Sequence, residues 1–316
     1  MRVRRSSVGR WMTALRLRTA PGSASARRRR LTALLALSLL PAALAGVTND
    51  RVLYQDDVLQ VVSPDGASVE QARAAAREAT AAWTFDLNLM RWADPAAMQR
   101  PFTLRLVSDD RLARERPGSR AYAVGNAFTV GLGLTGDASI NGTFAHELGH
   151  LQAFRVLGGR SVPHYFLEGH GLMMNQLYSD HLGLDRHAVL ADQARTILSL
   201  TAEEARTILT DEERSRKDPN MESMGLFFVE YLRVRKTMPD AVPRMGRVFE
   251  LVGRSRTYAQ AFGHVYGLSL QRTVSEIVAF LHRTAAHPAE RLKGTRFEQY
   301  APGATAPAPR QAPTPR

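Results

Sequence analysis

The five residues His146-Glu147-Leu148-Gly149-His150 constrain this chain more than any other part of its sequence. On an α-helix, residues four positions apart share a face, so the two imidazoles can reach the same point beside the helix. Two imidazoles held in this way are ligands for one Zn²⁺ ion, and a glutamate next to the first can take a proton from the water that the ion activates. The pentad therefore predicts a helix that carries two metal ligands and a general base together.

The pentad alone is a moderate signal, because a chain of this composition produces it by chance roughly once in a hundred such sequences. Its surroundings strengthen it. It follows predicted strands, and apolar residues from Phe144 to Phe154 recur around it at helical spacing. The alternative is an ordinary amphipathic helix whose two histidines only pack or face solvent.

A catalytic zinc site needs a third protein ligand and one open position for water. Glu168 is a candidate for that ligand, because a turn at Gly158-Gly159 and a second helix from about His164 can bring it back beside the first helix. His170 competes for the role. Residues two positions apart on a helix point about 200° apart, so only one of the two can face the metal. The alternative for His170 is a place behind the ligands or at the surface.

The pentad, a gap of 17 residues, and the sequence P-x-(aromatic)-x-x-E-G from Pro163 to Gly169 together resemble the gluzincins. The likeness is strongest to their peptidase MA-like group of exported or membrane-linked metallopeptidases. It covers roughly residues 51–285. Tyr165 and Gly171 depart from it, standing where many members carry tryptophan and alanine. Three further stretches carry the resemblance: 121–130, 224–232 and 261–270.

The resemblance implies a metallopeptidase that binds one Zn²⁺ through His146, His150 and Glu168. Glu147 is then the base that activates water for attack on a peptide carbonyl, without a covalent intermediate. Zincins commonly add a Tyr or His donor for the developing oxyanion. Four residues are candidates for that donor or for a place behind the ligands, with packing or surface exposure as the alternative for each: Tyr231, Tyr178, His170 and His164.

The resemblance also places a substrate beside the sheet. The strand that contains Ala127, Phe128 and Thr129 is expected at the sheet edge next to the metal, where an extended peptide can pair with its backbone. The alternative is that this strand is internal. The chain has no G-x-M-E-N sequence of the kind that captures a substrate amino terminus. We therefore expect an endopeptidase and have no support for an aminopeptidase.

Hydrophobic periodicity predicts an α+β fold, which the resemblance makes zincin-like: a small mixed sheet with an edge strand over the HExxH helix, then a mostly helical C-terminal lobe. The predicted strands are 52–62, 102–107 and one or two within 121–134. The predicted helices are 68–90, 139–157, 164–182, 185–200, 221–237, 241–252 and 270–284, with shorter ones begun by capping boxes at Thr201–Glu204 and Thr210–Glu213.

Four segments are expected along the chain. Residues 1–45 form a signal peptide, and residues 46–158 form the subdomain with the sheet and the active-site helix. Residues 159–290 form a helical subdomain that carries the third ligand. Residues 291–316 form a disordered tail rich in proline and alanine.

The leader determines both the charge and the location that we expect. Four arginines at 27–30, an apolar run at 31–40 and an A-x-A sequence at 43–45 have the layout of a secretory signal peptide. A retained anchor is the alternative, but residues 31–47 are short for a membrane span. Ten arginines lie in residues 1–30, so the formal charge falls from +12 to +2 once the leader is removed. We expect an exported protein, periplasmic or extracellular, with no stable membrane span after cleavage and no nucleic-acid partner.

The chain contains no cysteine, so any metal must be held by His, Asp or Glu. The expected partner is a peptide or protein substrate, and the sequence does not specify an oligomeric state. Two alternatives remain: an envelope protein that uses the same fold and its zinc for binding or assembly, and a zinc hydrolase of a non-peptide amide. The intact Glu147 favours an enzyme, because a structural metal site has no need of a base.

Overall fold

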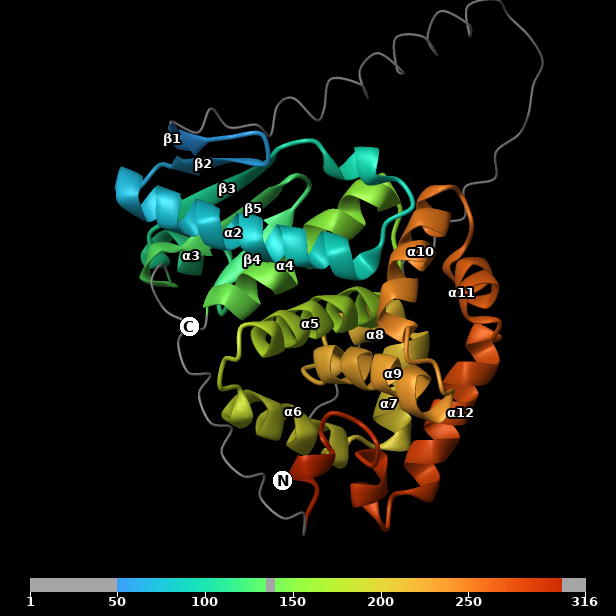
Figure 1. Ribbon diagram of the computed structural model, residues 1–316. Coiled ribbons are helices and arrows are strands. Elements are labelled where there is room, and N and C mark those ends of the chain that lie inside the picture. Colours follow the sequence, from blue (N-terminus) through green and yellow to red (C-terminus); the bar gives the residue numbers. More distant parts are fainter. Residues whose placement is uncertain (1–49, 135–139, 303–316) are drawn as a thin grey trace, which may run out of the picture. The chain divides into compact units, whose positions relative to one another are not determined.

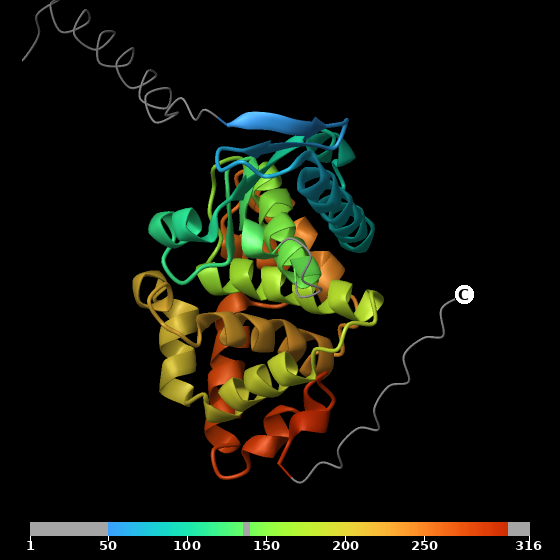
Figure 2. The ribbon, with the colours of Figure 1, turned by 90° about the vertical axis from the view of Figure 1, so that its left-hand side faces the viewer.

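The computed structural model describes residues 50–134 and 140–302. A five-stranded mixed sheet with helices packed against it forms the first part of this region, and helices form nearly all of the second part (Figure 1 and Figure 2). The predicted α+β class is confirmed. The predicted signal peptide and residues 303–316 lie outside the described residues.

The sheet has the strand order β1-β2-β3-β5-β4. Its strands are β1 (Arg51–Gln55), β2 (Leu59–Ser63), β3 (Phe102–Val107), β4 (Ala121–Val124) and β5 (Ala127–Gly131). The three central strands are parallel, and each edge strand is antiparallel to its neighbour. The single strand expected over residues 52–62 is wrong. The Asp56 carboxylate accepts the backbone N–H groups of Val58 and Leu59 and turns the chain into a hairpin.

β5 is internal, so the expectation that Ala127, Phe128 and Thr129 form the sheet edge is wrong. β5 pairs with β3 on one side and with β4 on the other. The strand is buried on both faces, because Phe128 and Val130 point to one face, Thr129 points to the other, and all three are buried, as is typical of a central strand. On β4, by contrast, Val124 is 54% exposed. The edge strand on this side of the sheet is therefore β4.

Two long helices lie side by side against the sheet (Figure 1). α2 (Val69–Met90) begins at the predicted capping box, in which Ser68 and Gln71 each accept the other's backbone N–H. Its buried face is mostly alanine, which lets it approach its neighbours closely. Trp83 packs on the first residue of β3, with ring centroids 5.0 Å apart. α4 (Ile140–Leu157) contacts α2, β4 and β5 and contains the HExxH pentad.

The helices expected from residue 164 onward are present within a few residues of their predicted ends. Their bounds are α5 (His164–His181), α6 (His187–Ser199), α7 (Ala202–Thr210), α8 (Glu212–Ser215), α9 (Met221–Arg235), α10 (Ala241–Gly253) and α12 (Leu270–Arg283). Two further helices have no counterpart in the prediction: α3 (Asp109–Glu115) and α11 (Tyr258–Tyr266). The capping box at Thr201 is confirmed. The one at Thr210 is wrong, because the Asp211 carboxylate caps α8 instead.

The chain beyond α12 packs on the helical part as far as residue 302. It forms two short 3₁₀ helices, η3 (Pro288–Arg291) and η4 (Glu298–Tyr300). Arg291 is buried and donates to four backbone carbonyl oxygens at the ends of α6 and α12. Phe297 is fully buried. A disordered tail that starts at residue 291 is therefore wrong for residues 291–302, because these contacts hold the segment in place.

The described residues, from Asp50 to residue 302, belong to one compact unit. The predicted boundary at residue 158 falls in the turn between α4 and α5, so it marks a change of architecture inside this unit. α5 is the central helix, since it packs against α4 on one side and α9 on the other (Figure 1). Among the described residues, no helix combines the length and the apolar character needed to cross a membrane.

α5 crosses α9 at two glycines. A Cβ on Gly225 would lie 2.0 Å from the carbonyl oxygen of Tyr165, and a Cβ on Gly169 would lie 2.5 Å from the carbonyl carbon of Gly225. Neither position has room for a side chain, so the two helix backbones touch. Gly169 directly follows Glu168, and the contact therefore fixes the backbone from which the predicted third ligand extends.

Candidate metal centre

A tight turn lays α4 and α5 side by side. Gly158 and Gly159 have φ angles of 58° and 85°, which glycine adopts without the steric cost that other residues incur. Pro163 then precedes α5, which begins at His164 as expected. The resulting helix-turn-helix unit brings Glu168 back beside the histidine face of α4.

His146, His150 and Glu168 come together, as predicted, in a cluster able to hold one metal ion. The Nε2 atoms of His146 and His150 lie 2.9 Å apart. The Oε2 atom of Glu168 lies 3.2 Å from Nε2 of His150 and 3.3 Å from Nε2 of His146. The three atoms form a nearly equilateral triangle with one donor from each side chain.

The spacing of the three donor atoms fits a small divalent ion. Ligand atoms bonded at about 2.0–2.1 Å to one tetrahedral ion lie about 3.3 Å from one another, close to the separations in this triangle. Two imidazoles and one carboxylate are also a donor set that zinc uses in catalytic sites. The residues present therefore fit a metal ion without any rearrangement of the helices.

The triad is recessed but open to solvent. The side chains of His146, His150 and Glu168 are 14%, 7% and 15% exposed. Glu147 is half-buried, and its negative charge reaches His146. The Glu147 carboxylate therefore lies beside three donor atoms that solvent can reach. A site that activates water needs such a base next to its metal ligands.

Electrostatic interactions within the triad favour a positive charge at its centre. Burial opposes protonation of His146, but the hydrogen bond to Glu168 and the charges of Glu147 and Glu168 outweigh it and raise the pKa of His146 to about 9. Burial also opposes ionisation of Glu168, yet the two histidines hold its pKa well below the usual range. A proton and a metal ion therefore compete for the same place.

Gly171 is where α5 comes closest to both histidine rings. A Cβ on this residue would lie 2.8 Å from Cε1 of His150 and 2.9 Å from Nε2 of His146. Both distances are shorter than side-chain contacts tolerate, so even alanine would push the imidazoles aside. The lack of a side chain at this position thus has a physical reason, because α5 and the two imidazoles are in contact here.

Of the four residues considered as oxyanion donors, His164 and His170 lie beside the triad. His164 stands one turn before Glu168 on α5, with its Nε2 atom 3.6 Å from Oε1 of that residue, and its side chain is 32% exposed. His170 is fully buried, and its ring packs on Phe249 with centroids 5.1 Å apart. His170 is therefore behind the ligands, out of reach of a substrate.

Tyr178 and Tyr231 lie elsewhere. Tyr178 is ten residues beyond Glu168 on α5, about 15 Å along the helix, and packs against Phe85. Tyr231 lies on α9, with its ring centroid 5.9 Å from that of Phe280. Both are buried, so for these two tyrosines the packing alternative holds.

Glu222 is a residue of the site that the sequence did not point to. It is an exposed residue in the first turn of α9, and its negative charge contributes to the raised pKa of His146. It lies more than fifty positions after the last predicted ligand, and no motif surrounds it. Only the packing of α9 on α5 brings it near.

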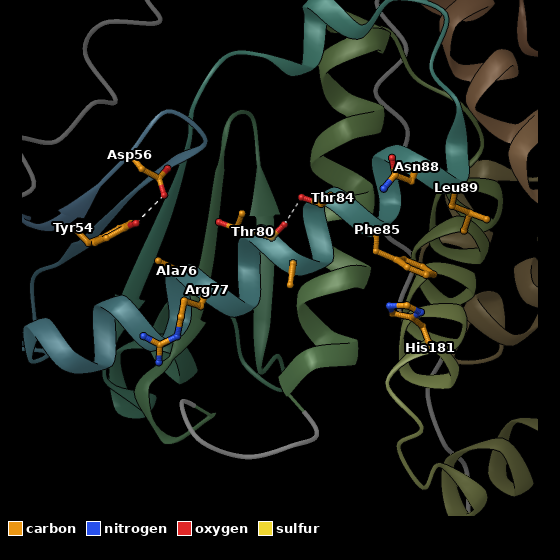
Figure 3. Close-up of a pocket in the computed structure, with 11 residues that line it drawn as sticks. Tyr54, Asp56, Ala76, Arg77, Thr80, Thr84, Phe85, Asn88, Leu89 and His181 are labelled. Atoms are coloured by element: carbon orange, nitrogen blue, oxygen red, sulfur yellow. Dashed lines mark hydrogen bonds between the residues drawn. The ribbon is translucent and has the colours of Figure 1, made fainter. Parts of the chain in front are cut away.

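A cavity of about 820 Å³ lies away from the triad. It is formed by the β1–β2 hairpin, the outer face of α2 and His181 at the end of α5 (Figure 3). On its hairpin side, the Tyr54 hydroxyl donates to the Asp56 carboxylate over 2.9 Å. None of the three triad residues lines this cavity, so the chemistry-bearing groups and this hollow are separate features of the surface.

Comparison of the sequence with protein-family models and with curated proteins finds no match. The geometry of the triad is thus the observation on which a functional conclusion rests.

Replacing Gly171 with alanine is expected to weaken metal binding about tenfold or more, because the new methyl group displaces both imidazoles. Competition with a chromophoric chelator measures the affinity. Gly263→Ala is the matched control: a Cβ there meets only an oxygen at 3.6 Å, and its metal affinity should equal that of the wild type. Equal affinity in Gly171→Ala and the wild type would contradict the steric reading.

Metal affinity is expected to rise with pH until about pH 9. Below the raised pKa of His146 the proton occupies the position that the metal needs, so each unit of pH below 9 weakens binding about tenfold, and above it the dependence levels off. Calorimetry in buffers of different ionisation enthalpy should report about one proton released per ion at neutral pH. Binding without proton release at pH 7 would show that His146 is neutral before the metal arrives.

Proposed function

We propose that this chain is an exported zinc-dependent metallopeptidase that cleaves peptide bonds by water attack. The observation that carries the proposal is the triad itself: His146, His150 and Glu168 present three donor atoms within 3.3 Å of one another. Glu147 follows the first of them on the same helix. A site that only held a metal for stability would have no use for a half-buried carboxylate at that position.

His146, His150 and Glu168 would hold the ion. Zinc is the best match to a set of two imidazoles and one carboxylate in a chain without cysteine. When bound, zinc supplies a Lewis acid and lowers the pKa of water to near neutrality. Three protein donors leave a position open for that water, and the exposed edges of the three side chains leave it accessible.

Glu147 and His164 carry the remaining steps. Glu147 accepts a proton at its carboxylate as the water attacks the peptide carbonyl, and later delivers that proton to the leaving amine. His164 is the one member of the four proposed donors that is both beside the triad and open to solvent. We assign to it the hydrogen bond to the oxygen that gains negative charge during attack.

β4 supplies an edge along which an extended peptide can pair. Val124 and Ala127 close the two-residue turn, so Val124 and Tyr122 direct their backbone groups at β5. The backbone N–H and C=O groups of Ala121 and Ala123 then face away from the sheet. Strand addition at these two alanines would hold a peptide by its main chain beside α4.

The decisive variant is Glu147→Gln, which keeps the size of the side chain and removes its basicity. Wild type and variant should both bind one zinc per chain by mass spectrometry, while cleavage of a broad peptide library falls between about a hundredfold and ten-thousandfold in the variant. Glu70→Gln removes an exposed carboxylate from the first turn of α2, outside the triad, and should retain most of the activity. Stoichiometric zinc in a wild type that cleaves no peptide would instead favour a binding protein of the same fold.

His164→Ala is expected to lower kcat about a hundredfold while KM and zinc content change little, because the lost hydrogen bond forms only as the oxyanion develops. His164→Gln retains a donor and should restore part of the rate. Steady-state kinetics with one well-cleaved peptide, together with zinc counting, provide the measurement. An unchanged kcat in His164→Ala would remove this residue from the mechanism.

A further inference from the structure

A second cavity, of about 610 Å³, lies where α4 and the β4–β5 hairpin end. Its third wall is the segment around η1 (Pro95–Met98), between α2 and β3. The side chains that line it include Asp94, Arg100, Asn126, Phe154 and Arg155.

One residue of α4, Phe154, links this cavity to the candidate metal centre. Phe154 stands one helical turn after His150, and the two rings are stacked with centroids 6.2 Å apart. Phe154 also lines the cavity, together with Gly125 and Asn126 of the turn that ends β4. A peptide that lies along β4 over the triad would therefore reach the cavity at the end of the strand.

The guanidinium of Arg155 is held by neutral groups alone. It donates twice to Oδ1 of Asn126, over 3.0 and 2.7 Å, and once to the carbonyl oxygen of Met98, over 3.1 Å. Its Cζ atom lies 4.8 Å from the centroid of the Trp83 ring. Within the described part of the chain no carboxylate pairs with it, so its positive charge is left without compensation.

Arg100 adds a second positive charge to the same cavity. It is exposed, and it forms no ion pair with any residue that the structure describes. Burial and, after it, the charge of Arg100 lower the pKa of Arg155 to about 10, which places the two guanidinium groups within electrostatic reach of each other. The cavity also contains Asp94, but one oxygen of that carboxylate already accepts the backbone N–H of Ala96. Two cations against one anion leave the cavity positive.

We propose that this cavity is a substrate subsite that receives a glutamate or aspartate side chain. The proposal rests on the proposed peptidase function and adds a substrate class to it. Antiparallel pairing is the slightly more stable arrangement, and a peptide paired in this way runs opposite to β4. Its residues before the cleaved bond then lie toward the end of β4. One helical turn of about 5.4 Å corresponds to roughly two residues of extended chain, so the acidic residue stands two or three positions before the cleaved bond.

The test compares pairs of peptides that differ only by glutamate or glutamine at those positions. The peptides are built on a sequence that the wild type cleaves in an unbiased library. A partly exposed ion pair predicts that kcat/KM is roughly fivefold higher for the glutamate peptide. The preference should shrink as salt is raised to about 0.5 M, because exposed charges are screened.

Arg100→Glu reverses the charge of the exposed member without changing the hydrogen bonds of Arg155, and it should turn the preference for glutamate into one for glutamine. Arg73→Glu reverses an exposed charge on α2 outside the cavity and should keep the wild-type ratio. The ratio between two peptides is unaffected by partial loss of folded protein.

The outcomes separate this inference from the function on which it rests. A wild type that cleaves neutral peptides with equal kcat/KM for glutamate and glutamine overturns the subsite and leaves the peptidase intact. An unchanged preference in Arg100→Glu also overturns it. A wild type that cleaves nothing, like Glu147→Gln, overturns the peptidase and the subsite together.

Discussion

The contact between α4 and α5 is the constraint on which the rest of the molecule depends. Each helix presents a glycine to the side chains of the other: a Cβ on Gly149 would lie 3.0 Å from Met174, and a Cβ on Gly171 would lie 2.8 Å from His150. Any larger residue would separate the helices and draw Glu168 away from the imidazoles. On its opposite side, α5 is in backbone contact with α9 at Gly225. The triad is thus a consequence of close backbone approach on both faces of one helix.

The close packing of α4 and α5 leaves the ring of His170 buried. Both of its ring nitrogens, and Nδ1 of His150, are buried without a hydrogen-bond partner among the described residues. Burial, then the neighbouring His150 and His146, lower the pKa of His170 to about 3, so its ring is neutral near pH 7. The ring of His170 fills the space between Gly149 and Phe249.

Local patterns made the site predictable, and long-range pairing limited the rest. His146, His150 and Glu168 could be placed together because two helices and a Gly-Gly turn are encoded in consecutive residues, and the resemblance favoured Glu168 over His170. The order of β4 and β5 in the sheet could not be predicted. A tight turn indicates that two strands pair, but it does not indicate which of them also pairs with β3. Glu222 and the buried Arg291 depend on helices that are distant in sequence, so no local signal marks them. The ordered segment 291–302 was missed for the same reason, because it is held by contacts with helices that are distant in sequence and its composition resembles that of a disordered tail.

The charge at the triad differs in sign from the charge at the cavity of Arg100 and Arg155. Glu147, Glu168 and Glu222 all raise the pKa of His146, so the region of the triad repels an acidic peptide. Arg100 and Arg155 attract one about a helical turn farther on. A divalent ion at the triad adds two positive charges and removes much of the repulsion. We therefore expect an acidic peptide to bind more tightly to the metal-loaded protein. Because such coupling is reciprocal, the bound peptide must tighten the hold on the metal by the same factor.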